Sequence, residues 1–186
     1  MKKVLRLFVM IFILSILMSY AIGIVEVKYK EEIDECAKLY GLDENLIYAV
    51  IFTESKFNPL AESDKGAMGL MQITPDTALW CAGKLGDELL ASEITVPEIN
   101  IKVGCFYLDY LIKRYGGEET AALAAYNAGA GNVDEWLCNE KYSPDGKKIE
   151  NTPFTETTDY IKKISLYKKI YAFLYGSKDK LNGKDN

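Results

Sequence analysis

The chain has 186 residues, a formal net charge of -5 and no histidine. Its length suits one domain with a single core once the N-terminal segment is set aside. The lack of histidine excludes serine and cysteine mechanisms that use an imidazole base, and zinc sites built on histidine. Lys and Arg are scattered and form no basic patch, so nucleic acid is not expected as a partner.

Residues 1–27 are predicted to be a membrane anchor or a signal segment. Basic residues precede an apolar run from Leu7 to Val25, which is long enough to span a bilayer as a helix. The alternative is a secretory signal cut after Ala21, because Ser19 and Ala21 are small residues at the separation that a cleavage site requires. The anchor is favoured, since the apolar core of a signal is typically shorter.

Either alternative places the domain at 28–176 outside the cytoplasm. The expected location is therefore the cell membrane, with one membrane pass and the domain on the outer side, or secretion after signal cleavage. The polar tail at 177–186 is expected to be disordered.

Helical periodicity, caps and breakers predict a mostly α-helical domain with no internal repeat and no clear set of strands. Helices are expected at about 31–40, from Asp43 to Glu54, from Pro75, and at about 97–115, 120–127 and 155–175. Gly129 and Gly131 are expected to break the chain, and a polar loop is expected at about 142–153.

Glu54 ends the second of these helices, which is apolar, and the loop SKFNPLAESDKGAMGLMQITPDTALW follows it. A carboxyl group between a buried helix and a polar loop has its ionised form disfavoured, so its pKa rises toward neutrality and it can donate a proton. The competing interpretation is a solvated carboxylate at a helix end.

The segment that starts at Glu54 resembles the motif of the soluble lytic transglycosylase family, whose members have a lysozyme-like fold and cut the glycan strands of peptidoglycan. The matching positions are Glu54, Ser55, Phe57, Pro59, Ala61, Ser63, Gly66, Ala67, Gly69, Leu70, Met71, Gln72, Ile73, Pro75, Thr77 and Ala78. The stretches NIKVGCFYLDYLIKRYGG, AALAAYNAGAGNV and PFTETTDYIKKI fit the same family in the same order. Together they cover roughly Lys30 to Tyr175.

Three positions depart from the family pattern. Thr74 stands where Met is frequent, Ala130 replaces a common Pro, and Thr158 replaces a common Arg. None of them removes the acid. Thr74 would alter the apolar wall beside the scissile bond, and Thr158 removes a cation that would pair with Glu156 or the substrate.

The resemblance implies a peptidoglycan lytic transglycosylase that cleaves between N-acetylmuramic acid and N-acetylglucosamine and leaves 1,6-anhydro ends. Glu54 would be its single catalytic acid and base, and no cofactor or metal is implied. The implied substrate-binding residues are Ser63, Gln72, Tyr126, Asn127, Glu156 and Tyr160. Turn stabilisation is the alternative role for Ser63 and Gln72, and core packing is the alternative for Tyr126.

Two other functions remain open at this point. A muramidase would hydrolyse the same bond, and a catalytically idle module would bind glycan within a cell-envelope assembly whose partner the sequence does not identify. The presence of Glu54 together with Ser63 and Gln72 argues against the idle module.

The four cysteines lack the paired short spacing of tetrahedral zinc sites, so a metal role is not expected. Outside the cell they could form two disulfides in three connectivities. Small buried thiols are favoured instead, because Cys105 falls on the apolar stripe of its helix and Cys81 follows Trp80.

Overall fold

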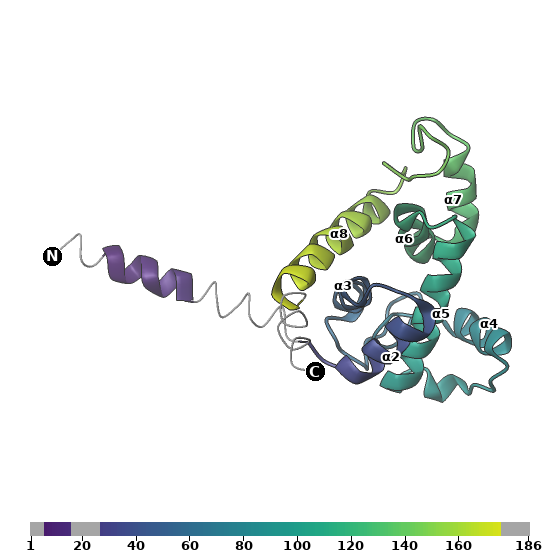
Figure 1. Cartoon of the computed structure of the whole chain (residues 1–186), viewed down its shortest axis with the longest axis horizontal. Coiled ribbons are helices and arrows are strands. Elements are labelled where there is room, and N and C mark those ends of the chain that lie inside the picture. The colour runs from purple at the N-terminus through teal and green to yellow at the C-terminus, as the bar shows by residue number, and fades with distance from the viewer. Residues whose placement is uncertain (1–5, 16–26, 176–186) are drawn as a thin grey trace, which may run out of the picture.

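The computed structural model describes residues 6–15 and 27–175 (Figure 1). A helix covers residues 6–15. The helices of the domain are α2 (Lys30–Tyr40), α3 (Glu44–Ser55), α4 (Pro75–Leu85), the 3-10 helix η1 (Ala91–Glu93), α5 (Pro97–Arg114), α6 (Glu119–Ala128), α7 (Ala130–Leu137) and α8 (Thr155–Tyr175). Pairing between extended segments in the described part of the chain is limited to two isolated bridges, Glu62 with Met68 and Met68 with Ile73. The mostly α-helical fold is confirmed.

Helix α3 lies at the centre of the domain. Every residue from Leu46 to Phe52 is at most 6% exposed, because the helix is apolar on all sides. It packs against α2 and α8, while α5 packs against α2, α4 and α6, and α6 also contacts α7 and α8. Glu54 therefore stands at the end of a helix that its neighbours hold on several sides.

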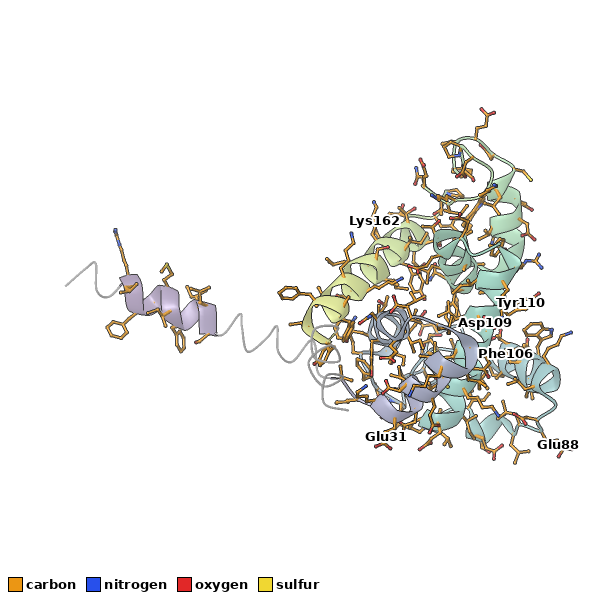
Figure 2. All side chains as sticks on the ribbon, viewed as in Figure 1. Glu31, Glu88, Phe106, Asp109, Tyr110 and Lys162 are labelled. Carbon is orange, nitrogen blue, oxygen red and sulfur yellow. The ribbon has the colours of Figure 1, made fainter. Side chains whose placement is uncertain are left out.

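The local signals that predicted the helices are present in the structure. The Asp43 carboxylate accepts a hydrogen bond from the backbone N–H of Asn45 at 2.9 Å and caps α3. Gly41, with φ of 68°, ends α2 in the left-handed conformation. Pro75 occupies the first turn of α4, after the Thr74 cap. Charged side chains that Figure 2 labels at the rim, Glu31 and Glu88 among them, are exposed.

One expectation about the helices was wrong. Gly129 and Gly131 do not interrupt the chain for long, because α7 begins at Ala130 and contains Gly131. Gly129, with φ of 87°, ends α6 and starts α7 at once. Val133 and Trp136 bury the apolar face of this short helix, so packing overrides the low helix propensity of glycine.

The structure describes residues 7–15 of the predicted membrane span, and the rest of the span lies outside the described residues. The large apolar side chains at 7–14 are exposed. Across residues 6–15 and 27–175, no helix has both the length and the apolar character needed to cross a membrane. The tail at 177–186 also lies outside the described residues.

All four cysteines are free thiols. Cys36, Cys81 and Cys105 are buried, which agrees with the favoured interpretation, whereas Cys138 is exposed. No cluster of potential metal ligands occurs among the residues that the structure describes.

Candidate active site

The loop between α3 and α4 leaves the acid-bearing helix through strained backbone. Lys56, Phe57 and Gln72 are non-glycine residues with φ of 54°, 60° and 49°, in the left-handed region that side chains disfavour. Such strain persists only where surrounding contacts hold it, and it gathers at functional sites. The backbone of the loop that follows Glu54 and Ser55 is therefore held in a defined conformation.

Asn100 fixes this loop to α5. The side chain is 1% exposed, and its Oδ1 accepts from the backbone N–H of Met71 at 2.7 Å. Its Nδ2 donates to the carbonyl oxygens of Met68 at 3.0 Å and Ile94 at 2.7 Å. Gly69 packs so closely here that a Cβ atom would lie 2.3 Å from Nδ2. The stretch NIKVG was recognised as a family motif, but nothing in the sequence predicted that Asn100 would bind this loop.

Two hydroxyl groups hold the same loop from other helices. Ser55 on α3 donates to the carbonyl oxygen of Leu70 at 2.8 Å, and Tyr126 on α6 donates to that of Met71 at 2.8 Å. The Leu70–Met71 segment is thus held by side chains from α3, α5 and α6. The contact of Tyr126 means that its phenol has a structural role at the site, in addition to packing.

Glu54 is held by a short hydrogen bond from α8. The Tyr160 hydroxyl donates to Glu54 Oε1 at 2.6 Å, and Tyr160 itself is 6% exposed. Glu54 is partly buried, so a group in solution can still reach it. The structure therefore brings together two of the predicted site residues that lie 106 positions apart in the sequence.

The surroundings of Glu54 favour its protonated form near neutrality. Burial raises the pKa of Glu54 from 4.5 to about 7, the Tyr160 bond and Lys56 act against the rise, and the charge of Glu156 adds to it. The position of Glu54 at the C-terminal end of α3 acts in the same direction, because the helix dipole disfavours an anion there. A carboxyl group of this kind suits general acid catalysis at neutral pH.

The two tyrosines stay protonated around this carboxyl group. Burial, with the added effect of the negative Glu54, raises the pKa of Tyr126 and that of Tyr160 well above their ordinary value. Both phenols therefore remain hydrogen-bond donors over the working pH range.

Asn127 and Glu156 lie at the junction of α6 and α8. The buried Thr157 donates through its hydroxyl to Asn127 Oδ1 at 2.7 Å. This bond uses the oxygen of the amide and leaves its NH2 group as a donor. Glu156, in the first turn of α8, is exposed, and its charge acts on Glu54.

Ser63 and Gln72 make contacts within the loop. Ser63 Oγ accepts from the backbone N–H of Ala67 at 3.0 Å. Gln72 Nε2 donates to the carbonyl oxygens of Ala61 and Gly69, both at 3.0 Å. These bonds stabilise turns, as the alternative interpretation expected, and they leave the Ser63 hydrogen and Gln72 Oε1 for a ligand. Their substrate-binding role stays a prediction.

Two of the three residues that differ from the family pattern form local hydrogen bonds. Thr74 caps α4 and donates to Thr77 Oγ1 at 2.9 Å. Thr158 shares a hydrogen bond with the Thr152 hydroxyl at 3.0 Å and accepts from the Thr152 backbone N–H at 3.2 Å. Thr158 thereby closes the loop that leads into α8.

Comparison with known proteins identifies relatives that match about three quarters of the chain. The soluble lytic murein transglycosylase of Salmonella typhimurium is 36% identical over 143 residues, which are 75% of this chain and 22% of that protein. The enzyme of the same name from Escherichia coli K12 is 37% identical over 136 residues, 72% of this chain and 21% of that protein. The chain thus spans about a fifth of the length of these relatives.

Solved structures share the fold. An inactive glutamate-to-glutamine mutant of the lytic transglycosylase Slt from Pseudomonas aeruginosa has a TM-score of 0.71 and 35% identity, and the match covers 83% of this chain and 24% of that one. The 70 kDa soluble lytic transglycosylase of Escherichia coli has a TM-score of 0.73 and 29% identity over 81% of this chain and 25% of that one. A complex of the 70 kDa soluble lytic transglycosylase with bulgecin A has a TM-score of 0.71 and 29% identity, over 80% of this chain and 24% of that one.

The family model described as the Transglycosylase SLT domain matches residues 31–149, which are more than half of the chain. This range contains the acid, the strained loop and the α6 residues of the site. The chain therefore belongs to the transglycosylase SLT domain family.

Proposed function

We propose that this chain is a peptidoglycan lytic transglycosylase, with Glu54 as its single catalytic acid and base. The 2.6 Å hydrogen bond from Tyr160 to Glu54, in surroundings that raise the pKa of Glu54 to about 7, supports the proposal most directly. Relatives named soluble lytic murein transglycosylase support the choice of substrate. The bond cleaved is the one from N-acetylmuramic acid to N-acetylglucosamine.

In the first step Glu54 acts as the acid. It transfers its proton to the glycosidic oxygen, and the bond from that oxygen to the anomeric carbon of N-acetylmuramic acid breaks. The carbonyl oxygen of the sugar's own N-acetyl group attacks the anomeric carbon and forms a cyclic oxazolinium ion. Tyr160 holds the carboxyl group in one orientation during this transfer.

In the second step the same group, now ionised, acts as the base. Glu54 takes the proton of the C6 hydroxyl, whose oxygen attacks the anomeric carbon and displaces the N-acetyl oxygen. The 1,6-anhydro ring closes, the N-acetyl group is restored, and Glu54 regains its proton without the consumption of water. The C6 hydroxyl outcompetes water because the bound sugar holds it next to the reacting carbon.

Five further residues are proposed to bind the glycan: Ser63, Gln72, Tyr126, Asn127 and Glu156. Internal hydrogen bonds leave Gln72 with an acceptor oxygen and Asn127 with a donor NH2 group. An N-acetyl amide carries one N–H donor and one carbonyl acceptor, so these two side chains are chemically complementary to it. The steps require no cofactor.

We also propose that residues 1–27 anchor the enzyme in the cell membrane, with the catalytic domain on the outer side where peptidoglycan lies. The basic start of the chain and the apolar run from Leu7 to Val25 support this arrangement. Full-length protein should sediment with membranes and keep its N-terminus. Soluble protein that begins at Ile22 would instead identify a cleaved signal.

The test of the activity is the digestion of purified, insoluble peptidoglycan by the full-length chain. Release of soluble muropeptides is expected. Binding of bulgecin A, the ligand in the complex of the 70 kDa relative, serves as a separate check that the candidate active site is folded. Sedimentation of the chain with peptidoglycan without any release would favour the idle glycan-binding module.

A further inference from the structure

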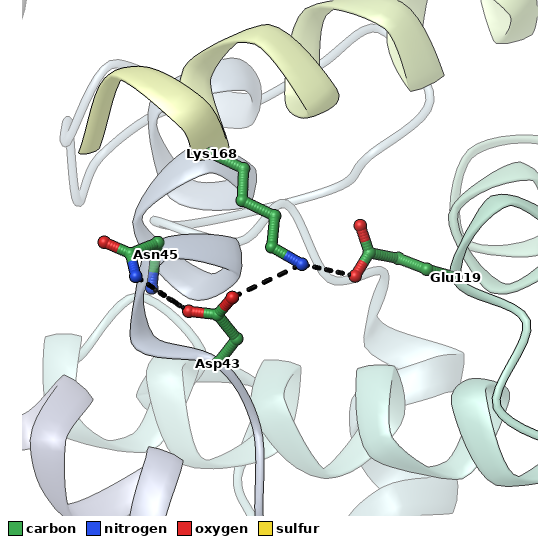
Figure 3. A network of polar contacts seen from close by, with 4 residues as sticks. All are labelled: Asp43, Asn45, Glu119 and Lys168. Carbon is green, nitrogen blue, oxygen red and sulfur yellow. Dashed lines mark hydrogen bonds and ion pairs between the residues drawn. The ribbon is translucent and has the colours of Figure 1, made fainter. Parts of the chain in front are cut away.

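A cation on α8 joins the starts of two other helices (Figure 3). Lys168 Nζ lies 2.6 Å from Glu119 Oε2 and 3.3 Å from Asp43 Oδ2. Asp43 caps α3, and its other oxygen, Oδ1, accepts from both the backbone N–H and the side-chain NH2 group of Asn45 at 2.9 Å. Glu119 is the first residue of α6. One ammonium group thus connects α3, α6 and α8.

These are the three helices that carry the core of the candidate active site. Helix α3 supplies Glu54, α6 supplies Tyr126 and Asn127, and α8 supplies Tyr160. Lys168 and Tyr160 lie eight residues apart on α8, a rise of about 12 Å. Asp43 and Glu54 lie at opposite ends of α3, a rise of about 16 Å. The α3–α8 pair is therefore held at one end by the Lys168 contacts and at the other by the Tyr160–Glu54 bond.

The network favours the charged forms of Lys168 and Asp43. Partial burial opposes the charge of Lys168, but its bonds to Glu119 and Asp43 outweigh this and raise the pKa of Lys168. Burial likewise acts against the ionised form of Asp43, yet the bonds from Asn45 and the charge of Lys168 lower the pKa of Asp43. With the ammonium group removed, the two carboxylates would be left as like charges without the cation that joins them.

We propose that Lys168 is a positioning residue of the active site, which holds α8 in register with α3 and α6 so that Tyr160 keeps its hydrogen bond to Glu54. The inference rests on the proposed function in that it takes Glu54 as the acid. An exposed ion pair contributes little, but Lys168 is only 27% exposed and bonds two carboxylates at once.

The pKa of Glu54 distinguishes positioning from stabilisation alone. The groups that act on it are Tyr160 and Glu156 on α8 and Lys56 after α3, together with burial. Lys168 influences Glu54 only through the placement of these groups. Because the Tyr160 bond lowers the pKa of Glu54, a lengthened bond raises it.

The experiment compares Lys168→Met with Lys168→Arg and with Lys169→Met in the full-length chain. Lys169 is the next residue on α8 and is exposed, so it serves as the matched control. The pKa of Glu54 is measured by 13C NMR of protein labelled at the glutamate side-chain carboxyl, and the signal is assigned by its loss in Glu54→Gln. This titration needs no substrate, so its outcome is independent of whether the chain cleaves peptidoglycan.

In Lys168→Met, the pKa of Glu54 should rise toward its value in Tyr160→Phe, and muropeptide release should fall about twofold to thirtyfold. Lys168→Arg should restore the parental pKa, and Lys169→Met should match the parent. If Lys168→Met does not fold, Glu119→Gln removes the shorter ion pair and should shift the pKa in the same direction. A folded Lys168→Met that has lower thermal stability and an unchanged Glu54 pKa would overturn the proposal.

Discussion

Replacing Glu54 with glutamine should abolish cleavage and, at the same time, stabilise the folded chain above neutral pH. The amide keeps the shape of the side chain and can still accept the hydrogen bond of Tyr160, but it cannot donate a proton to the glycosidic oxygen. Loss of activity should be at least about a hundredfold, the lower range for general acid catalysis.

The stability effect follows from the pKa of Glu54, which burial raises from 4.5 to about 7. The folded chain binds this proton more tightly than the unfolded chain does. The resulting stabilisation is present in full below pH 4.5 and is lost as the pH rises through about 7. The difference between 4.5 and about 7, at 1.36 kcal/mol per pKa unit, sets an upper limit of about 3 kcal/mol for this loss. The actual loss is smaller, because solvent still reaches part of the carboxyl group.

Glutamine does not ionise, so the variant should escape this loss. Urea unfolding of the full-length parent and variant at a series of pH values from 4 to 8 measures the difference in the free energy of unfolding. The two proteins should be similar near pH 4, and the variant should be the more stable near pH 8. Parallel stability curves over the whole range would refute the raised pKa, and undiminished cleavage by the folded variant would refute the catalytic role.

Two further substitutions test the supports of the site. Tyr160→Phe removes the hydrogen bond that lowers the pKa of Glu54, so the upper limb of the pH profile of cleavage should move to higher pH. An unmoved limb would show that the bond does not set the pKa. Asn100→Ala removes three hydrogen bonds to backbone groups and should cost about 2–4 kcal/mol of stability by urea unfolding. A cost below about 1 kcal/mol would contradict the role of Asn100 in holding the loop.

The local part of this structure could be predicted from the sequence. The caps at Asp43 and Thr74 fixed the starts of α3 and α4, and an apolar stretch between Asp43 and Glu54 predicted a buried helix with an acid at its end. Helix α7 was missed because glycine at 129 and 131 is a strong local signal, whereas the burial of Trp136 depends on tertiary packing.

The contacts that build the site could not be predicted in the same way. The hydroxyl of Tyr160 meets Glu54 across 106 residues of sequence, and no local pattern encodes such a distance. Lys168 is one of several lysines on α8, and the sequence does not separate it from its exposed neighbour Lys169. Only the arrangement of α3, α6 and α8 shows that Lys168 joins the carboxylates of Asp43 and Glu119.

The most direct test of the proposed reaction is the chemical form of the ends that the full-length chain releases from purified peptidoglycan. The muropeptides are analysed by mass spectrometry without prior reduction. If the C6 hydroxyl is the nucleophile, the muramic acid ends should carry the 1,6-anhydro ring, weigh one water less than hydrolytic products and resist borohydride. Ends of full mass that borohydride reduces would contradict the proposed reaction and identify a hydrolytic muramidase.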